Sequence, residues 1–89
     1  MDTSKIERQI SDVFVSLGSI VEKVNDRVNY VLNGVFCVPA YVRAFNGFVV
    51  EYALSRNDAN KNRYEDGEVI PVDDNLLARL KTDIQENTQ

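Results

Sequence analysis

The chain has 89 residues, of which 44% are hydrophobic and 27% charged, and its formal net charge is −4. This length and balance are typical of a single globular domain spanning residues 1–89, and they exclude an intrinsically disordered chain. The acidic balance disfavours binding to nucleic acid, because phosphate contacts require clustered Lys and Arg side chains.

The first predicted element is an amphipathic helix over Ser4–Asn25. Apolar residues recur at alternating steps of four and three, and the pattern keeps its phase across Gly18-Ser19, where a bend is compatible with it. Ser4 and Glu7 have the spacing of a capping box. The stripe contains Ile6, Ile10, Val13, Leu17, Ile20 and Val24. We expect this stripe to pack against the rest of the domain.

Two Asn-Gly pairs, Asn33-Gly34 and Asn46-Gly47, each lie between apolar runs. Both residues tolerate positive φ, so the pair favours the two-residue turn of a β-hairpin. The sequence therefore predicts a three-stranded antiparallel meander with strands Val28–Leu32, Val35–Phe45 and Phe48–Ser55. In the alternative, the first helix continues to Leu32 and ends at Gly34, which would suggest a coiled-coil dimer.

Two-residue turns also fix the strand register. They place Tyr30 opposite Cys37, Tyr41 opposite Tyr52 and Arg43 opposite Val50. One face of the meander then collects apolar side chains, interrupted by Arg43: Val28, Tyr30, Leu32, Val35, Cys37, Tyr41, Phe45, Phe48, Val50, Tyr52 and Leu54. Because Pro39 cannot donate a backbone hydrogen bond, we expect the middle strand to be bent or interrupted there.

After Leu54 the chain becomes polar. Ser55–Tyr64 favours a loop or one short helix capped by Ser55 or Asn57, and Glu65–Glu68 is predicted to be a turn. Val69-Ile70 can add a short strand. Asp73 or Asp74 is then expected to cap a last helix that buries Leu76, Leu77, Leu80 and Ile84, with residues 85–89 frayed. The predicted fold class is α+β, with both helices on one face of the meander.

The negative charge is concentrated in one segment. Residues 1–50 are neutral, whereas the segment 51–74 holds seven acidic residues against three basic ones. The candidate contacts for a basic protein partner are Asp58, Glu65, Asp66, Glu68 and Asp73. In the alternative interpretation, these acids form a solvated loop that keeps the chain soluble.

Catalytic and metal-binding patterns are weak. The chain has no histidine, the usual general base and a common metal ligand, and Cys37 is expected to be a buried, inert thiol. Asp58, Asn60 and Asn62 have the spacing of a calcium loop, but Arg63 stands where the loop needs Gly. We expect no catalytic residue, metal or cofactor, and we expect these three side chains to cap a helix or close turns.

Arg43 is the one charged residue on the predicted apolar face. With Tyr41 and Tyr52 it is a candidate for binding an anionic ligand. In the alternative, Arg43 lies at the sheet margin with its stem packed and its guanidinium stacked on Tyr52 or paired with an acid.

These features predict a small, non-catalytic protein-binding or regulatory domain, such as an inhibitor or immunity-type protein that covers a basic site on a nuclease. Two alternatives stay open. One is a self-associating structural protein, a homodimer included, that uses the second sheet face or the helical stripe. The other is a small-molecule binder or enzyme that uses Arg43 and the tyrosines.

The sequence also bears on location. A single cysteine excludes an internal disulfide and fits a reducing compartment. No hydrophobic signal core follows the N-terminal residues, and no apolar run is long enough to cross a bilayer. We therefore expect a cytoplasmic protein without membrane contact.

Overall fold

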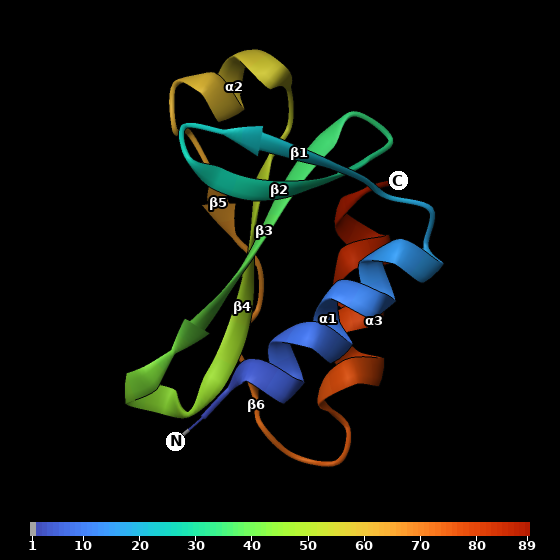
Figure 1. Ribbon diagram of the computed structural model, residues 1–89, viewed down its shortest axis with the longest axis vertical. Helices are drawn as coiled ribbons and strands as arrows, with labels where there is room; N and C mark the ends of the chain where they lie inside the picture. Colours follow the sequence, from blue (N-terminus) through green and yellow to red (C-terminus); the bar gives the residue numbers. More distant parts are fainter. Residues whose placement is uncertain (1) are drawn as a thin grey trace.

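The computed structural model describes residues 2–89. An antiparallel sheet carries two helices side by side on one face, and a short helix lies at the end shown at the top of Figure 1. The elements are α1 (Ser4–Ser16), β1 (Ile20–Val24), β2 (Arg27–Leu32), β3 (Val35–Val42), the 3-10 turn η1 (Arg43–Phe45), β4 (Gly47–Ala53), α2 (Arg56–Asn60), β5 (Glu65–Asp66), β6 (Ile70–Pro71) and α3 (Leu76–Asn87). The sheet order is β1-β2-β3-β4-β5, and β6 also pairs with β4. The predicted α+β class is confirmed.

Helix α1 is shorter than predicted, because it ends at Ser16 and not at Asn25. Gly18 adopts a φ of 90°, its N–H donates to the Val15 carbonyl at 3.0 Å, and the Ser19 N–H donates to the Phe14 carbonyl at 3.1 Å. These two bonds are the Schellman motif that closes a helix on a left-handed glycine. The predicted Ser4–Glu7 capping box is also wrong, since the Glu7 carboxylate accepts from the Thr3 hydroxyl at 3.1 Å.

The end of the predicted helix is a fourth strand, β1, joined to β2 by a hairpin that the prediction missed. Asn25 and Asp26 have φ values of 51° and 64°, and Val24 pairs with Arg27 across them. Positive φ at both central residues is the type I′ geometry that Asn and Asp tolerate. Because β2 begins at Arg27, the predicted strand up to Leu32 is confirmed and the alternative of a continuous helix is wrong.

The two Asn-Gly pairs behave differently. At Asn33-Gly34 the predicted two-residue turn forms, with Leu32 opposite Val35 and Tyr30 opposite Cys37. At the second pair, η1 and Asn46 make a four-residue connection that joins Val42 to Gly47.

The register of β3 against β4 is therefore shifted by four residues from the predicted one. Tyr41 lies opposite Phe48, Cys37 lies opposite Tyr52, and Arg43 falls outside the strand. The predicted pairings of Tyr41 with Tyr52 and of Arg43 with Val50 are wrong. Because the shift is an even number of residues, every side chain that stays in β3 or β4 lies on the sheet face predicted for it.

Pro39 ends the pairing of β2 with β3, but β3 itself continues through it. β3 continues through it, opposite Val50 on β4, but the pairing of β2 with β3 stops at Tyr30 and Cys37. The next hydrogen-bonded pair would need an N–H at position 39, which proline lacks. The β1–β2 hairpin therefore leaves the main sheet at this point.

Both faces of the sheet are covered. Under α1 and α3 lies the main core: Ile10, Phe14, Leu32, Val35, Cys37, Phe48, Val50, Tyr52, Ile70, Leu76, Leu80 and Ile84. A second cluster, of Val24, Phe36, Ala53 and Ala59, lies under α2. Three residues predicted for the core face are exposed: Val28 on the diverging hairpin, Phe45 in η1 and Leu54 beyond the end of β4.

The C-terminal third departs from the prediction in four places. The predicted turn at Glu65-Asp66 is the short strand β5, which pairs with β4, and the strand expected at Val69-Ile70 forms one residue later as β6. The prediction that Asp73 or Asp74 caps the last helix is wrong, because the N-cap of α3 is Asn75, and Asp73 instead accepts from the Asn75 N–H at 2.8 Å. The predicted fraying is wrong, because Thr88 is buried and its carbonyl accepts from the Asn33 side chain at 2.6 Å. No helix in residues 2–89 is long and apolar enough to span a membrane.

Candidate protein-binding surface

A groove of about 520 Å³ runs along α3 beside the β5–β6 connection, and we call it the acidic groove. Its charged lining residues are Glu68, Asp83, Glu86 and Arg79. Arg79 lies 3.3 Å from Glu68, and both side chains are largely exposed, so this ion pair contributes little to stability. With three carboxylates against one guanidinium, the groove favours a cationic group.

Asp83 is held in place from inside the domain. One of its carboxylate oxygens accepts from the buried Tyr52 hydroxyl at 2.6 Å, and the other accepts from the Glu68 N–H at 3.4 Å. Burial, and then the neighbouring Asp83 carboxylate, raise the pKa of Tyr52 above its ordinary range. A Cβ atom at Gly67 would lie 2.5 Å from the same carboxylate. The groove therefore has a fixed acid on a helix, supported by the core.

The five predicted partner-binding residues do not form one surface. Glu68 lines the acidic groove, and Glu65 and Asp66 are exposed on β5. Asp73 bonds the backbone of Asn75, and Asp58 lies on α2 in a hollow shared with Glu65 and Arg63. The prediction missed Asp83 and Glu86. Their spacing of three residues is the sequence signal that could have placed them on one side of the helix, with Asp83 at the border of the buried stripe and Glu86 exposed.

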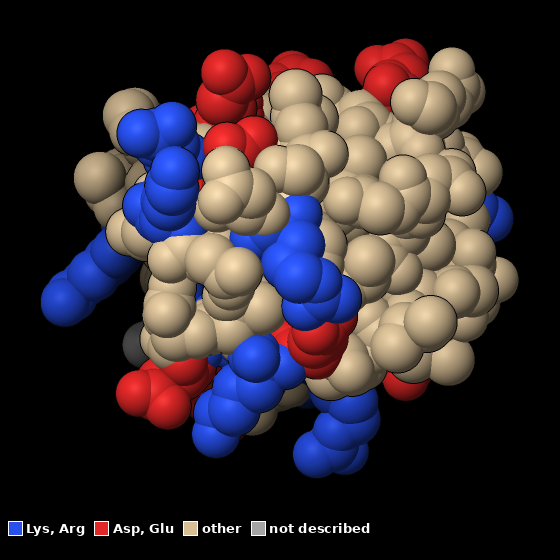
Figure 2. All heavy atoms as spheres, turned by 90° about the horizontal axis from the view of Figure 1, so that it is seen from above, with Lys and Arg blue, Asp and Glu red and all other residues tan. Residues whose placement is uncertain are grey.

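The end of the molecule that carries α2 and the β1–β2 turn holds side chains of both charges. Figure 2, which looks onto this end, shows Lys and Arg side chains projecting at its left and lower sides, with Asp and Glu side chains among them. The basic residues of these segments are Lys23, Arg27, Arg56, Lys61 and Arg63. Arg27 pairs with Glu51, and Arg56 pairs with Glu22. Because the same segments also carry Glu22, Asp26 and Asp58, this end has mixed charge, whereas three of the four charged residues that line the acidic groove are acids.

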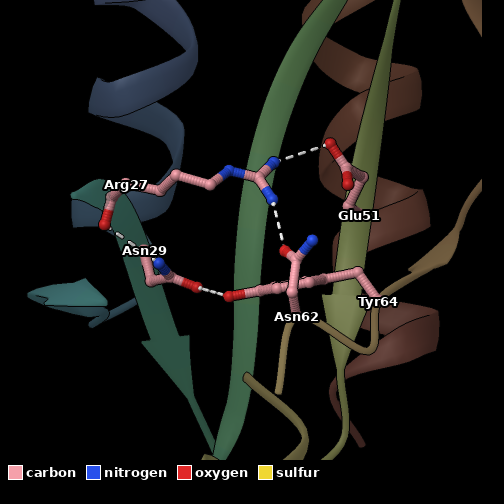
Figure 3. A network of polar contacts seen from close by, with 5 residues as sticks. All are labelled: Arg27, Asn29, Glu51, Asn62 and Tyr64. Atoms are coloured by element: carbon pink, nitrogen blue, oxygen red, sulfur yellow. Dashed lines mark hydrogen bonds and ion pairs between the residues drawn. The ribbon is translucent and has the colours of Figure 1, made fainter. Parts of the chain in front are cut away.

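A network of polar side chains anchors the β1–β2 hairpin where its ladder with β3 has stopped (Figure 3). The Arg27 guanidinium donates to Glu51 at 2.8 Å and to the Asn62 side chain at 3.2 Å, and it lies over the Tyr64 ring. The Tyr64 hydroxyl donates to the fully buried Asn29 at 2.6 Å. These contacts join β2, β4 and the segment after α2, so we interpret the network as structural.

The three candidates for an anionic ligand face are separated. The Tyr41 hydroxyl donates to the Asn46 side chain at 2.8 Å, whereas the Tyr52 hydroxyl is committed to Asp83. Arg43 is exposed in η1, outside the strands. The predicted pairing of Tyr41 with Tyr52, on which that face depended, is not formed.

The cysteine and the segment with calcium-loop spacing both have structural roles. Cys37 is fully buried, and burial raises the pKa of its thiol to about 12. In the segment with calcium-loop spacing, the Asn62 side chain accepts from Arg27, and Ser55 caps α2 by accepting from the Asp58 N–H at 3.1 Å. Within residues 2–89, no group of three or more His, Cys, Asp and Glu side chains is arranged to hold a metal ion.

Comparisons of this chain with protein-family models, with curated proteins and with solved structures give no match.

Proposed function

We propose that this chain is a non-catalytic protein-binding domain that contacts a basic partner through the acidic groove. The observation that carries the proposal is the convergence of Glu68, Asp83 and Glu86 on one groove of about 520 Å³. Glu65 and Asp66 are exposed on β5 but do not line this groove, so they are not part of the proposed contact.

The arrangement suits fast, charge-guided association. A cationic partner is attracted to the acidic groove, so the charge of the groove raises the rate at which such a partner meets it. An inhibitor or immunity-type protein that covers a cationic site is one form of this function. The single cysteine, which excludes an internal disulfide, supports a cytoplasmic setting for it.

A nitrogen-15 labelled sample titrated with a Lys-rich peptide tests the proposal. We expect amide chemical-shift changes confined to α3 and the β5–β6 connection, and we expect them to disappear at high salt because screening weakens contacts between exposed charges. An uncharged peptide of the same length is the control. Shift changes centred on the α2 end, or equal changes with the control peptide, would contradict the proposal.

A further inference from the structure

Strand β1 ends the sheet with an open edge. It pairs with β2 on one side, and no strand in the described residues 2–89 pairs with its other side. The two-residue turn makes Val24 and Arg27 the closing hydrogen-bonded pair, so Ile20, Glu22 and Val24 direct their backbone groups towards β2. The backbone N–H and C=O groups of Val21 and Lys23 therefore point away from the sheet.

Apolar side chains flank this edge on both faces of the sheet. Ile20 is 71% exposed and Val21 is 56% exposed, although both are β-branched residues that proteins usually bury in sheets. The right side of Figure 2, where α1 ends and β1 begins, shows few charged atoms. Native proteins normally protect an edge strand with charges or proline; β1 carries two charges, of which Glu22 is paired with Arg56, so Lys23 is its one charge without an ion pair among the described residues.

We propose that a second copy of the chain covers this edge, and that β1 pairs with the partner's β1 in an antiparallel, two-fold symmetric contact centred on Val21. Outward-pointing residues must meet outward-pointing residues, and this register lets the two Val21 residues exchange backbone hydrogen bonds. It also places Ser19 opposite the partner's Lys23 and Ile20 opposite the partner's Glu22. Two continuous sheets would thus become one.

The neighbouring registers fit less well. Centring the contact on Glu22 sets the two Glu22 carboxylates directly opposite each other, and like charges across a strand pair are destabilising. Centring it on Ile20 places Gly18, which lies outside β1 with a φ of 90°, opposite the partner's Glu22. The Val21 register avoids both problems and leaves Glu22 paired with Arg56 in each copy.

The contact is independent of the proposed partner site. The acidic groove lies beside β5 and α3, and β5 is at the other end of the sheet order from β1. A contact through one five-residue strand falls at or below the about 1,200 Å² that marks the low end of specific interfaces. We therefore expect a dimer that dissociates in the micromolar range.

Sedimentation velocity over a concentration series tests the inference. We expect the wild type to pass from monomer to dimer, and we expect Val21→Glu and Val21→Lys each to be monomeric, because each places two like charges on the symmetry axis. An equimolar mixture of the two variants is expected to dimerise again, since Glu then faces Lys. Leu54→Glu is the matched control: Leu54 is 67% exposed but lies outside β1, so this variant should dimerise like the wild type.

Three results would overturn the inference. The first is a wild type that stays monomeric up to about 1 mM, the concentration of a very weak complex. The second is loss of the dimer in Leu54→Glu to the same extent as in Val21→Glu. The third is a mixture of the Glu and Lys variants that stays monomeric while thermal melts show both variants folded.

Discussion

The polar network around Asn29 gives a sharp test of how the β1–β2 hairpin is held. Replacing Tyr64 by Phe removes one hydroxyl and leaves the ring in place under the Arg27 guanidinium. The Asn29 side-chain oxygen, which accepts from that hydroxyl at 2.6 Å, then loses its partner on a residue with no exposed surface. No other contact of the network is removed.

The size of the effect follows from the burial of Asn29. Leaving a buried acceptor unsatisfied costs about 1–3 kcal/mol. Because Tyr64 itself is half-buried and water can approach from its side, we expect a loss of about 1–2 kcal/mol of unfolding free energy, in the lower part of that range. For a domain of this size each kcal/mol lowers the Tm by about 4–8 °C.

Urea and thermal unfolding of Tyr64→Phe measure this loss. Tyr30→Phe is the control, because the Tyr30 ring stacks on Phe14 while its hydroxyl has no hydrogen-bond partner among the described residues, and we expect it to change stability by less than about 0.5 kcal/mol. A double-mutant cycle with Asn29→Ala should return a coupling energy of about 1 kcal/mol. A Tyr64→Phe variant as stable as Tyr30→Phe, with no coupling to Asn29, would refute this interpretation of the network.

Three further predictions follow. Gly67→Ala is expected to lose about 1–3 kcal/mol of unfolding free energy, since a Cβ there would lie 2.5 Å from the Asp83 carboxylate and 2.9 Å from the Tyr52 ring. Gly18→Ala meets no atom within 4 Å, so its cost in chemical denaturation should be only the roughly 1 kcal/mol of a left-handed alanine. The free energy of unfolding should fall as the pH rises from about 9 to about 12, because the Cys37 thiol ionises in that window when unfolded but stays protonated when buried. In Cys37→Ala the free energy of unfolding should fall less over the same pH range, because the contribution of the thiol is removed.

Local turn chemistry accounts for what the sequence predicts well. Asn33-Gly34 needs only positive φ at two residues, and the neighbouring strands pair as the pattern indicates. At Asn46-Gly47 the same dipeptide does not form a two-residue turn. Residues 43–45 form η1, and of the pair only Asn46 adopts positive φ. An Asn-Gly pair therefore indicates that the chain reverses direction nearby, but the length of the connecting loop also depends on how the residues around the pair pack.

The helix error has a different origin. Ile20 and Val24 are four residues apart, which continues a helical stripe, but they also lie on one face of a strand, because alternate residues do so. Gly18 was compatible with a bend or with a helix end, and only the long-range pairing of β1 with β2 decides between them. The acidic groove was missed for a similar reason, since it joins Glu68 to Asp83 and Glu86 across the turn before α3.

The most direct test of the account compares two charge reversals of equal size. Glu86 lines the acidic groove and Asp12 lies on α1 outside it, both are exposed, and neither makes a hydrogen bond or ion pair within the described residues. Glu86→Lys and Asp12→Lys therefore change the net charge equally. With a Lys-rich peptide in stopped flow at low salt, we expect Glu86→Lys to lower the association rate constant by about fivefold or more, and Asp12→Lys by about twofold or less. Equal effects of the two substitutions would show that net charge alone guides binding, and would contradict the acidic groove as the contact site.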